Sequence, residues 1–244
     1  MSHDWGFDGN LIATKGITIG TMVGHGSWQN IHSTKVNGDG IIAFPQNCTF
    51  ISCVSDGNAG NGWTLTYGIQ ACEFIECHGS ANDGWEFEIR QDGGYGWGLS
   101  AQPQHLHFVS GIAEQKGSPF FADTGLGGVH ISEGTYIVFE SFNFYEVENA
   151  FVMTPSATGF GIPGWVTLRD CHVYGGLHLD AAKGGVAQSM GGTNEPLYLT
   201  GWNRIDSIVN GSTATIYDDG VRPPDRYTTE GTGAAPSLRR PPQS

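Results

Sequence analysis

Residues 47–53 read Asn-Cys-Thr-Phe-Ile-Ser-Cys, and residues 71–77 read Ala-Cys-Glu-Phe-Ile-Glu-Cys. A Gly- and Asn-rich turn follows each segment and leads to a short strand-like run that begins with tryptophan, at residues 63–67 and 85–89. A repeat of this length, built from short alternating segments, is typical of a solenoid in which each repeat stacks on its neighbour. The repeat therefore predicts strands about 4.8 Å apart, with equivalent side chains in columns.

Other segments have the same pattern of apolar and variable residues in alternation, ending in a small or polar residue and then Cys, Gly or Phe. They are residues 31–44, 106–111 with 120–123, 137–142 with 151–154, 166–171 with 177–180, and 197–216. We therefore expect an all-β parallel β-helix of about seven rungs. It would have an N-terminal cap over 1–28, the β-helix over 29–216, and an extended Pro-, Gly- and Arg-rich tail over 217–244.

The composition limits the classes of function. The 244 residues include 38 glycines, which suits a fold rich in tight turns, and the net charge is −13. Such a charge disfavours nucleic-acid binding, and it indicates either simple solubility or an acidic groove for cations or uncharged glycans. No apolar run is long enough for a membrane span, and no signal-peptide pattern follows Met1. The five cysteines lack the spacing of zinc ligands, so we expect buried free thiols, no metal site and no cofactor.

The quoted units resemble a known family when they are taken with their turns: NCTFISC with GNGWTLTY, ACEFIEC with NDGWEFEI, and NGDGIIAF at 37–44. They resemble the rungs of pectate-lyase-like right-handed parallel β-helices, and most of all those of tailed-bacteriophage tailspikes and related virion proteins. The resemblance covers residues 29 to about 216. It implies a homotrimer in the virion, assembled in the host cytoplasm, which contacts other virion proteins and binds or cleaves host-surface polysaccharide. No complete catalytic signature of the family is present.

Catalytic candidates come from the alternation, which predicts that one sheet carries outward polar side chains at 64, 66, 86, 88, 123, 178 and 180. Glu86 and Glu88 lie two residues apart on one strand, and Glu88 and Asp123 are expected on neighbouring rungs, about 5 Å apart. Paired carboxylates at such distances are what glycoside hydrolysis requires, so Glu86, Glu88 and Asp123 are the predicted acid and nucleophile. The predicted glycan-binding residues are Tyr95 and Trp97 in the glycine-rich loop 90–104, with His178 and Asp180.

Several alternatives remain open. The outward carboxylates could be solvated surface, and a lyase could instead use His107, Arg169 and Glu73. The turns at 37–39 and 56–58 could bind Ca²⁺ or be plain turns. Trp63 and Trp85 are expected to face inward. The leading hypothesis for function is a non-catalytic virion protein, followed by a polysaccharide depolymerase, and then by a bacterial carbohydrate-binding or epimerase-like β-helix.

Overall fold

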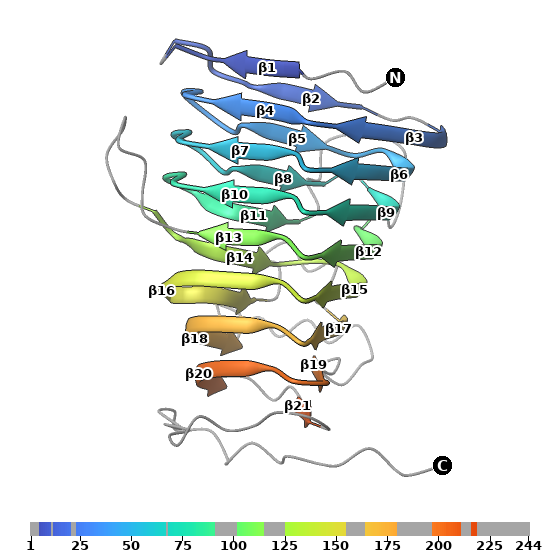
Figure 1. Cartoon of the computed structure of the whole chain (residues 1–244), viewed down its shortest axis with the longest axis vertical. Coiled ribbons are helices and arrows are strands. Elements are labelled where there is room, and N and C mark those ends of the chain that lie inside the picture. The colour runs from blue at the N-terminus through green and yellow to red at the C-terminus, as the bar shows by residue number, and fades with distance from the viewer. Residues whose placement is uncertain are drawn as a thin grey trace, which may run out of the picture.

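The computed structural model shows a parallel β-helix whose strands stack in chain order along one axis (Figure 1). None of the described residues belongs to a helix, so none forms one long and apolar enough to cross a membrane. The structure describes residues 5–10, 12–20, 23–66, 68–90, 102–114, 125–154, 164–179, 197–210 and 216–218.

Each of the first five turns of the β-helix contributes one strand to each of three faces, which we call sheets 1, 2 and 3. Sheet 1 contains β1 (Trp5–Asp8), β4 (Ile31–Thr34), β7 (Val54–Asp56), β10 (His78–Ser80) and β13 (Ile112–Glu114). Sheet 2 contains β2 (Ile17–Ile19), β5 (Ile41–Ala43), β8 (Trp63–Leu65), β11 (Trp85–Ile89) and β14 (Gly127–Ile131). Sheet 3 contains β3 (Val23–Gln29), β6 (Gln46–Ile51), β9 (Gln70–Ile75), β12 (Gln104–Val109), β15 (Thr135–Glu140), β17 (Gly164–Arg169), β19 (Leu197–Thr200) and β21 (Ile216–Asp218).

Three long strands run round the corner between sheets 1 and 2: β16 (Asn143–Met153), β18 (His172–Leu179) and β20 (Arg204–Asn210). They join the two sheets into one ribbon. Strands β1, β2 and β3 pair in parallel with β4, β5 and β6, so the predicted N-terminal cap contains a turn of the β-helix itself.

The core is a set of aromatic columns that run along the axis. Phe50, Phe74, Phe108 and Phe139 from four successive sheet-3 strands stack with ring centroids 4.8, 4.6 and 4.5 Å apart. Every ring in this column is buried. Trp63 meets Phe50 and Phe74 edge-on from sheet 2. The five cysteines are buried free thiols, as predicted, and Cys53 and Cys77 lie next to each other on adjacent rungs.

The corner between sheet 3 and sheet 1 is made by one residue in the left-handed conformation on each rung. The residues are Asn30, Ser52, Glu76, Ser110, Ser141 and Asp170, with φ between 50° and 53°. A single left-handed residue between two extended segments turns the chain sharply without adding a loop. This is why the sequence pattern has a small or polar residue at each of these positions.

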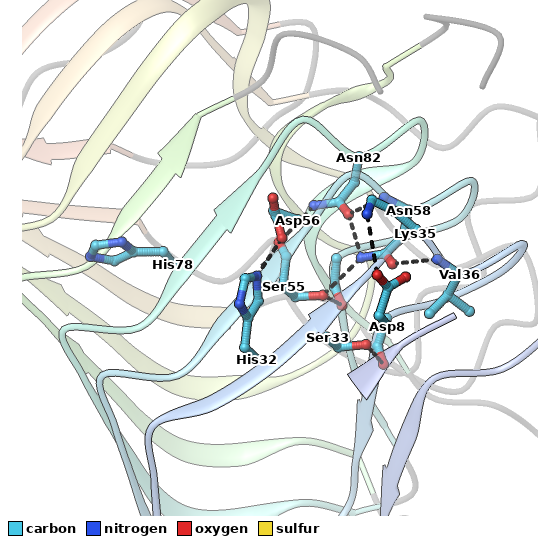
Figure 2. Close-up of polar contacts among 12 residues, drawn as sticks. Asp8, His32, Ser33, Lys35, Val36, Ser55, Asp56, Asn58, His78 and Asn82 are labelled. Carbon is cyan, nitrogen blue, oxygen red and sulfur yellow. Dashed lines mark hydrogen bonds and ion pairs between the residues drawn. The ribbon is translucent and has the colours of Figure 1, made fainter. Parts of the chain in front are cut away.

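The corner between sheet 1 and sheet 2 holds a buried asparagine ladder (Figure 2). Asn58 Nδ2 donates to Asn82 Oδ1 at 2.8 Å, and the backbone N–H of Val36 donates to Asn58 Oδ1 at 2.9 Å. The ladder satisfies backbone groups that no strand partner can reach. In the neighbouring turn, Asp39 accepts hydrogen bonds from the Asn61 N–H and the Thr64 hydroxyl. The described polar groups of these turns therefore link rungs, which favours plain turns over Ca²⁺ sites.

Two details of the predicted register are wrong. The sequence pattern predicts residues 120–123 as the strand beside β11 on the next rung, but the strand that pairs with β11 is residues 127–131. Trp63 pairs with Phe87 rather than with Trp85, so Trp63 faces inward as predicted but Trp85 does not. Trp85 instead lies against the imidazole of His130 on the outside of sheet 2, with ring centroids 4.8 Å apart.

Candidate functional sites on two outer faces

The first candidate site is a chain of three polar side chains on the outside of sheet 2. The carboxylate of Glu88 lies 2.9 Å from His130 Nδ1, and His130 Nε2 lies 2.5 Å from the Thr154 hydroxyl. A carboxylate only accepts hydrogen bonds, so a neutral imidazole here carries its proton on Nδ1. Nε2 is then the acceptor for the Thr154 hydroxyl. The arrangement is a carboxylate, an imidazole and a hydroxyl in series.

The register of the β-helix brings these three residues together. Glu88 and His130 are directly paired between β11 and β14, and Thr154 directly follows β16, the next strand in the sheet. The backbone N–H of Thr154 donates to the carbonyl of Ile131, which fixes the end of this segment. The ring of Trp85 stacks on the imidazole and limits its rotation. The Glu88 side chain is 6% exposed and that of His130 is 16% exposed, and Thr154 is partly exposed like His130.

Glu86, the second predicted carboxylate, does not face the same surface. Its side chain is fully buried at the corner that holds the asparagine ladder. There Asn82 donates hydrogen bonds to the carboxylate from both its side-chain amide and its backbone N–H. Burial raises the pKa of Glu86 well above its ordinary value, although these hydrogen bonds oppose the shift. The predicted pair of Glu86 and Glu88 on one face is therefore wrong.

The remaining predicted residues are only partly covered by the structure. Asp123, Tyr95, Trp97 and Asp180 lie outside the described residues. The position equivalent to Glu88 on the next rung belongs to His130 and not to Asp123, which corrects the predicted neighbour. His178 lies in β18 and pairs with Val152 and Val209, in the same sheet as β14.

The second candidate site is an aromatic strip on the outside of sheet 3, which the sequence analysis did not predict. It consists of His105, Tyr136, Trp165, Tyr198 and Tyr217. Consecutive ring centroids are 4.8, 5.9, 5.8 and 5.1 Å apart, and no interplanar angle exceeds 21°. The strip crosses five consecutive strands, from β12 to β21, parallel to the axis of the β-helix. Tyr136 is 48% exposed and Trp165 is 43% exposed.

Three residues of the strip have an unfavourable backbone conformation. His105, Tyr136 and Trp165 have φ values of 52°, 56° and 51°, in the left-handed region. A bulky residue there costs about 1–2 kcal/mol relative to the right-handed region, and Gly or Asn would be favoured. The equivalent position on an earlier rung is Asn47, at the same kind of φ. Backbone geometry therefore does not explain why aromatic residues occupy three successive rungs.

A small charged cluster flanks the strip on the same face. Glu140 Oε2 lies 3.2 Å from His107 Nε2 and 3.4 Å from Arg169 Nη1. All three side chains are between one third and one half exposed, so the cluster lies at the surface beside the strip. The alternative of a lyase would use His107, Arg169 and Glu73, and the structure places His107 and Arg169 on this surface with Glu73, which pairs with His107. Among the described residues, no group of three or more His, Cys, Asp or Glu side chains could hold a metal ion.

Both sites are indicated by sequence patterns outside the repeat that predicted the fold. His105, Tyr136 and Trp165 each directly precede an inward residue of sheet 3, so alternation alone places them outside. His130 lies between two apolar residues, Val129 and Ile131, which is the pattern of a short strand.

No protein-family model, no curated protein and no solved structure matches this chain.

Proposed function

We propose that this chain is a glycan-binding β-helical protein of a bacteriophage virion and that it binds an extended polysaccharide along the aromatic strip of sheet 3. The observation that carries the proposal is the exposure of Tyr136 and Trp165 in a strained backbone conformation. The left-handed φ itself recurs at the equivalent Asn47 and Ala71 and belongs to the corner, so it is the choice of bulky, exposed rings at a position that disfavours them that supports binding.

The form of the strip suits a polymer rather than a small ligand. Five rings on successive rungs extend about 20 Å along the axis, since neighbouring strands lie about 4.8 Å apart. Aromatic rings offer apolar contact area to the C–H faces of sugars at little cost in side-chain entropy. The adjacent His107, Glu140 and Arg169 side chains supply donors and acceptors for sugar hydroxyls. With a net charge of −13 over the chain, we expect a neutral glycan to be preferred to a polyanionic one.

The virion location and the homotrimer are proposed on the resemblance of the rungs to those of tailspike-type proteins. A physical reason supports self-association. Among the described strands, β20 and β21 each pair on one side only, and an open strand edge tends to acquire a partner. Native mass spectrometry of the purified protein tests the trimer, and a monomer at micromolar concentration would contradict it. A hydrolase that uses Glu86 with Glu88 is no longer supported, because Glu86 is buried away from the outer face.

Binding to a panel of bacterial surface glycans tests the proposal. We expect Trp165→Gly to weaken binding by about 30-fold, the effect of losing a central aromatic contact of about 2 kcal/mol. The same substitution relieves the left-handed strain, which offsets the lost ring contacts, so we expect the free energy of unfolding to change by less than about 1 kcal/mol. The matched control is Leu126→Ala, which removes another exposed apolar side chain, 51% exposed, beside sheet 2. Equal affinity of the wild type and Trp165→Gly, or an equal loss in the control, would contradict the proposal.

A further inference from the structure

We propose that Glu88, His130 and Thr154 form a nucleophilic relay that hydrolyses carboxylic esters with short acyl groups. This activity goes beyond glycan binding and does not depend on it, because the three residues lie on sheet 2 and the aromatic strip lies on sheet 3. The proposal starts from the order of groups in the series: carboxylate, Nδ1, Nε2, hydroxyl. A hydroxyl nucleophile needs this order, in which a base takes its proton and a third group holds the base.

The geometry fits each of the three roles. Both carboxylate oxygens of Glu88 lie within 3.1 Å of His130 Nδ1, so the tautomer and the ring orientation are fixed. His130 Nε2 is within hydrogen-bond distance of the hydroxyl whose proton it would accept. Trp85 covers one face of the imidazole and helps to hold the ring in place.

The burial of the three residues also fits these roles. The orienting carboxylate is almost fully buried, whereas the imidazole and Thr154, which directly follows strand β16, are both partly exposed. Thr64 in the same column gives a contrast with a structural threonine. It is buried, and its hydroxyl donates to Asp39 without an intervening imidazole. The Thr154 hydroxyl, in contrast, meets a base.

The reaction balances with water as the only co-reactant. The Thr154 Oγ1 attacks the ester carbonyl carbon while His130 Nε2 accepts the hydroxyl proton, and Glu88 stabilises the imidazolium that forms. The tetrahedral intermediate then collapses, the bond from carbon to the alkoxy oxygen breaks, and the alcohol leaves with the proton from His130. Water, deprotonated by the same imidazole, attacks the acyl-threonine ester and releases the carboxylic acid, which restores the Thr154 hydroxyl.

The first test is steady-state hydrolysis of 4-nitrophenyl acetate by the full chain. We expect Thr154→Val to reduce kcat/KM to the background of the buffer, and Thr154→Ser to retain activity because it keeps the hydroxyl. We expect Glu88→Gln to lower kcat by a factor of up to about 10⁴, since the amide can favour the wrong tautomer of His130. Thr167→Val, which removes a hydroxyl from the outside of sheet 3, is the matched control and should leave the rate unchanged.

The second test separates a nucleophile from a structural hydroxyl. A fluorophosphonate probe should phosphonylate Thr154 Oγ1 with loss of fluoride, and peptide mass spectrometry should find the adduct on this residue in the wild type and on the serine of Thr154→Ser. The Glu88→Gln variant should label at least 100-fold more slowly while its melting temperature shows that it is folded. Turnover that persists in Thr154→Val would overturn the proposal, as would a folded wild-type protein with neither turnover above background nor an adduct at Thr154.

Discussion

Phe74 lies in the middle of the aromatic column of sheet 3, and its replacement by alanine tests whether this column holds the β-helix together. The ring is fully buried and stacks between Phe50 at 4.8 Å and Phe108 at 4.6 Å, with Trp63 edge-on at 5.9 Å. Truncating a buried Phe to Ala costs about 3–5 kcal/mol, because transfer energy is lost and a cavity remains. The three ring contacts place this site towards the upper part of that range.

Chemical denaturation with guanidinium, followed by tryptophan fluorescence, measures the loss, since Trp63 contacts the missing ring. For a chain of this size, a loss of about 4 kcal/mol corresponds to a decrease of about 8–16 °C in the melting temperature. Phe74→Leu keeps most of the volume and should cost less than about 1.5 kcal/mol. Tyr136→Ala, in the half-exposed strip on the opposite side of the same sheet, should cost less than about 1 kcal/mol. Similar losses for Phe74→Ala and Tyr136→Ala would refute the assignment of the two columns to the inside and the outside.

Three further predictions concern buried groups. Because the pKa of Glu86 is raised in the folded protein, the stability that this carboxyl contributes is fully present below about pH 4.5 and is lost as the pH rises toward its folded pKa. Glu86→Gln should therefore flatten the curve of melting temperature against pH above 4.5. Parallel curves for the wild type and the variant would contradict this. A Cβ at Gly79 would lie 2.8 Å from the carbonyl oxygen of Glu86. Gly79→Ser should therefore lower the free energy of unfolding by about 1–3 kcal/mol in a denaturant titration. An unchanged midpoint would show that the corner between sheets 1 and 2 can accommodate a larger side chain. Burial raises the pKa of Cys72 to about 11 and that of Cys171 to about 12. At pH 8, iodoacetamide should therefore alkylate both thiols at least about 100-fold more slowly than thiols of the unfolded chain, as measured by peptide mass spectrometry. Rapid labelling of the folded protein would place them at the surface.

The fold could be predicted from the sequence because sheet 3 repeats the same inward residues. Phe50 and Phe74 must occupy the same interior column, and two cysteines flank each of them at fixed distances. The connections between strands vary in length, so the constant spacing between the first two repeats does not predict where the later strands begin. Residues 91–101 and 115–124 separate the later strands by more than the first repeat allows.

Strand β14 illustrates why the register beyond the first repeats was harder to predict. Its first residues, Gly127 and Gly128, look like part of a loop. In the structure they are glycines for reasons of packing, because a Cβ at Gly127 would collide with the ring of Trp85 and one at Gly128 with the carbonyl of Ala150. The shifted register placed Glu88 opposite Asp123 instead of His130, so the relay to Thr154 could not be predicted.

Glu86 was misplaced for a different reason. Simple alternation puts it on the same face as Glu88, but it lies at the position of Gly40 and Gly62, where the chain turns from sheet 1 into sheet 2. On the earlier rungs, Ser33 and Ser55 from sheet 1 donate to the carbonyls of these glycines. The next rung has Gly79 in place of the serine, and the Glu86 side chain is buried at this corner. The small residue in sheet 1 and the large one in sheet 2 compensate each other in size, and this can be recognised only when the positions of both sheets are known.

An engineered disulfide most directly tests the stacking of rungs on which both sites depend. Thr49 and Glu73 are partners in the register of β6 and β9, and the next residue in the same outward column is His107, one rung further on. In-register neighbours about 4.8 Å apart can form a disulfide, whereas residues two rungs apart, at about 10 Å, cannot. We predict that mild oxidation of the folded double variant Thr49→Cys/Glu73→Cys gives a quantitative cross-link between positions 49 and 73, and that Thr49→Cys/His107→Cys gives none. A cross-link in the second variant but not in the first would contradict the parallel β-helix.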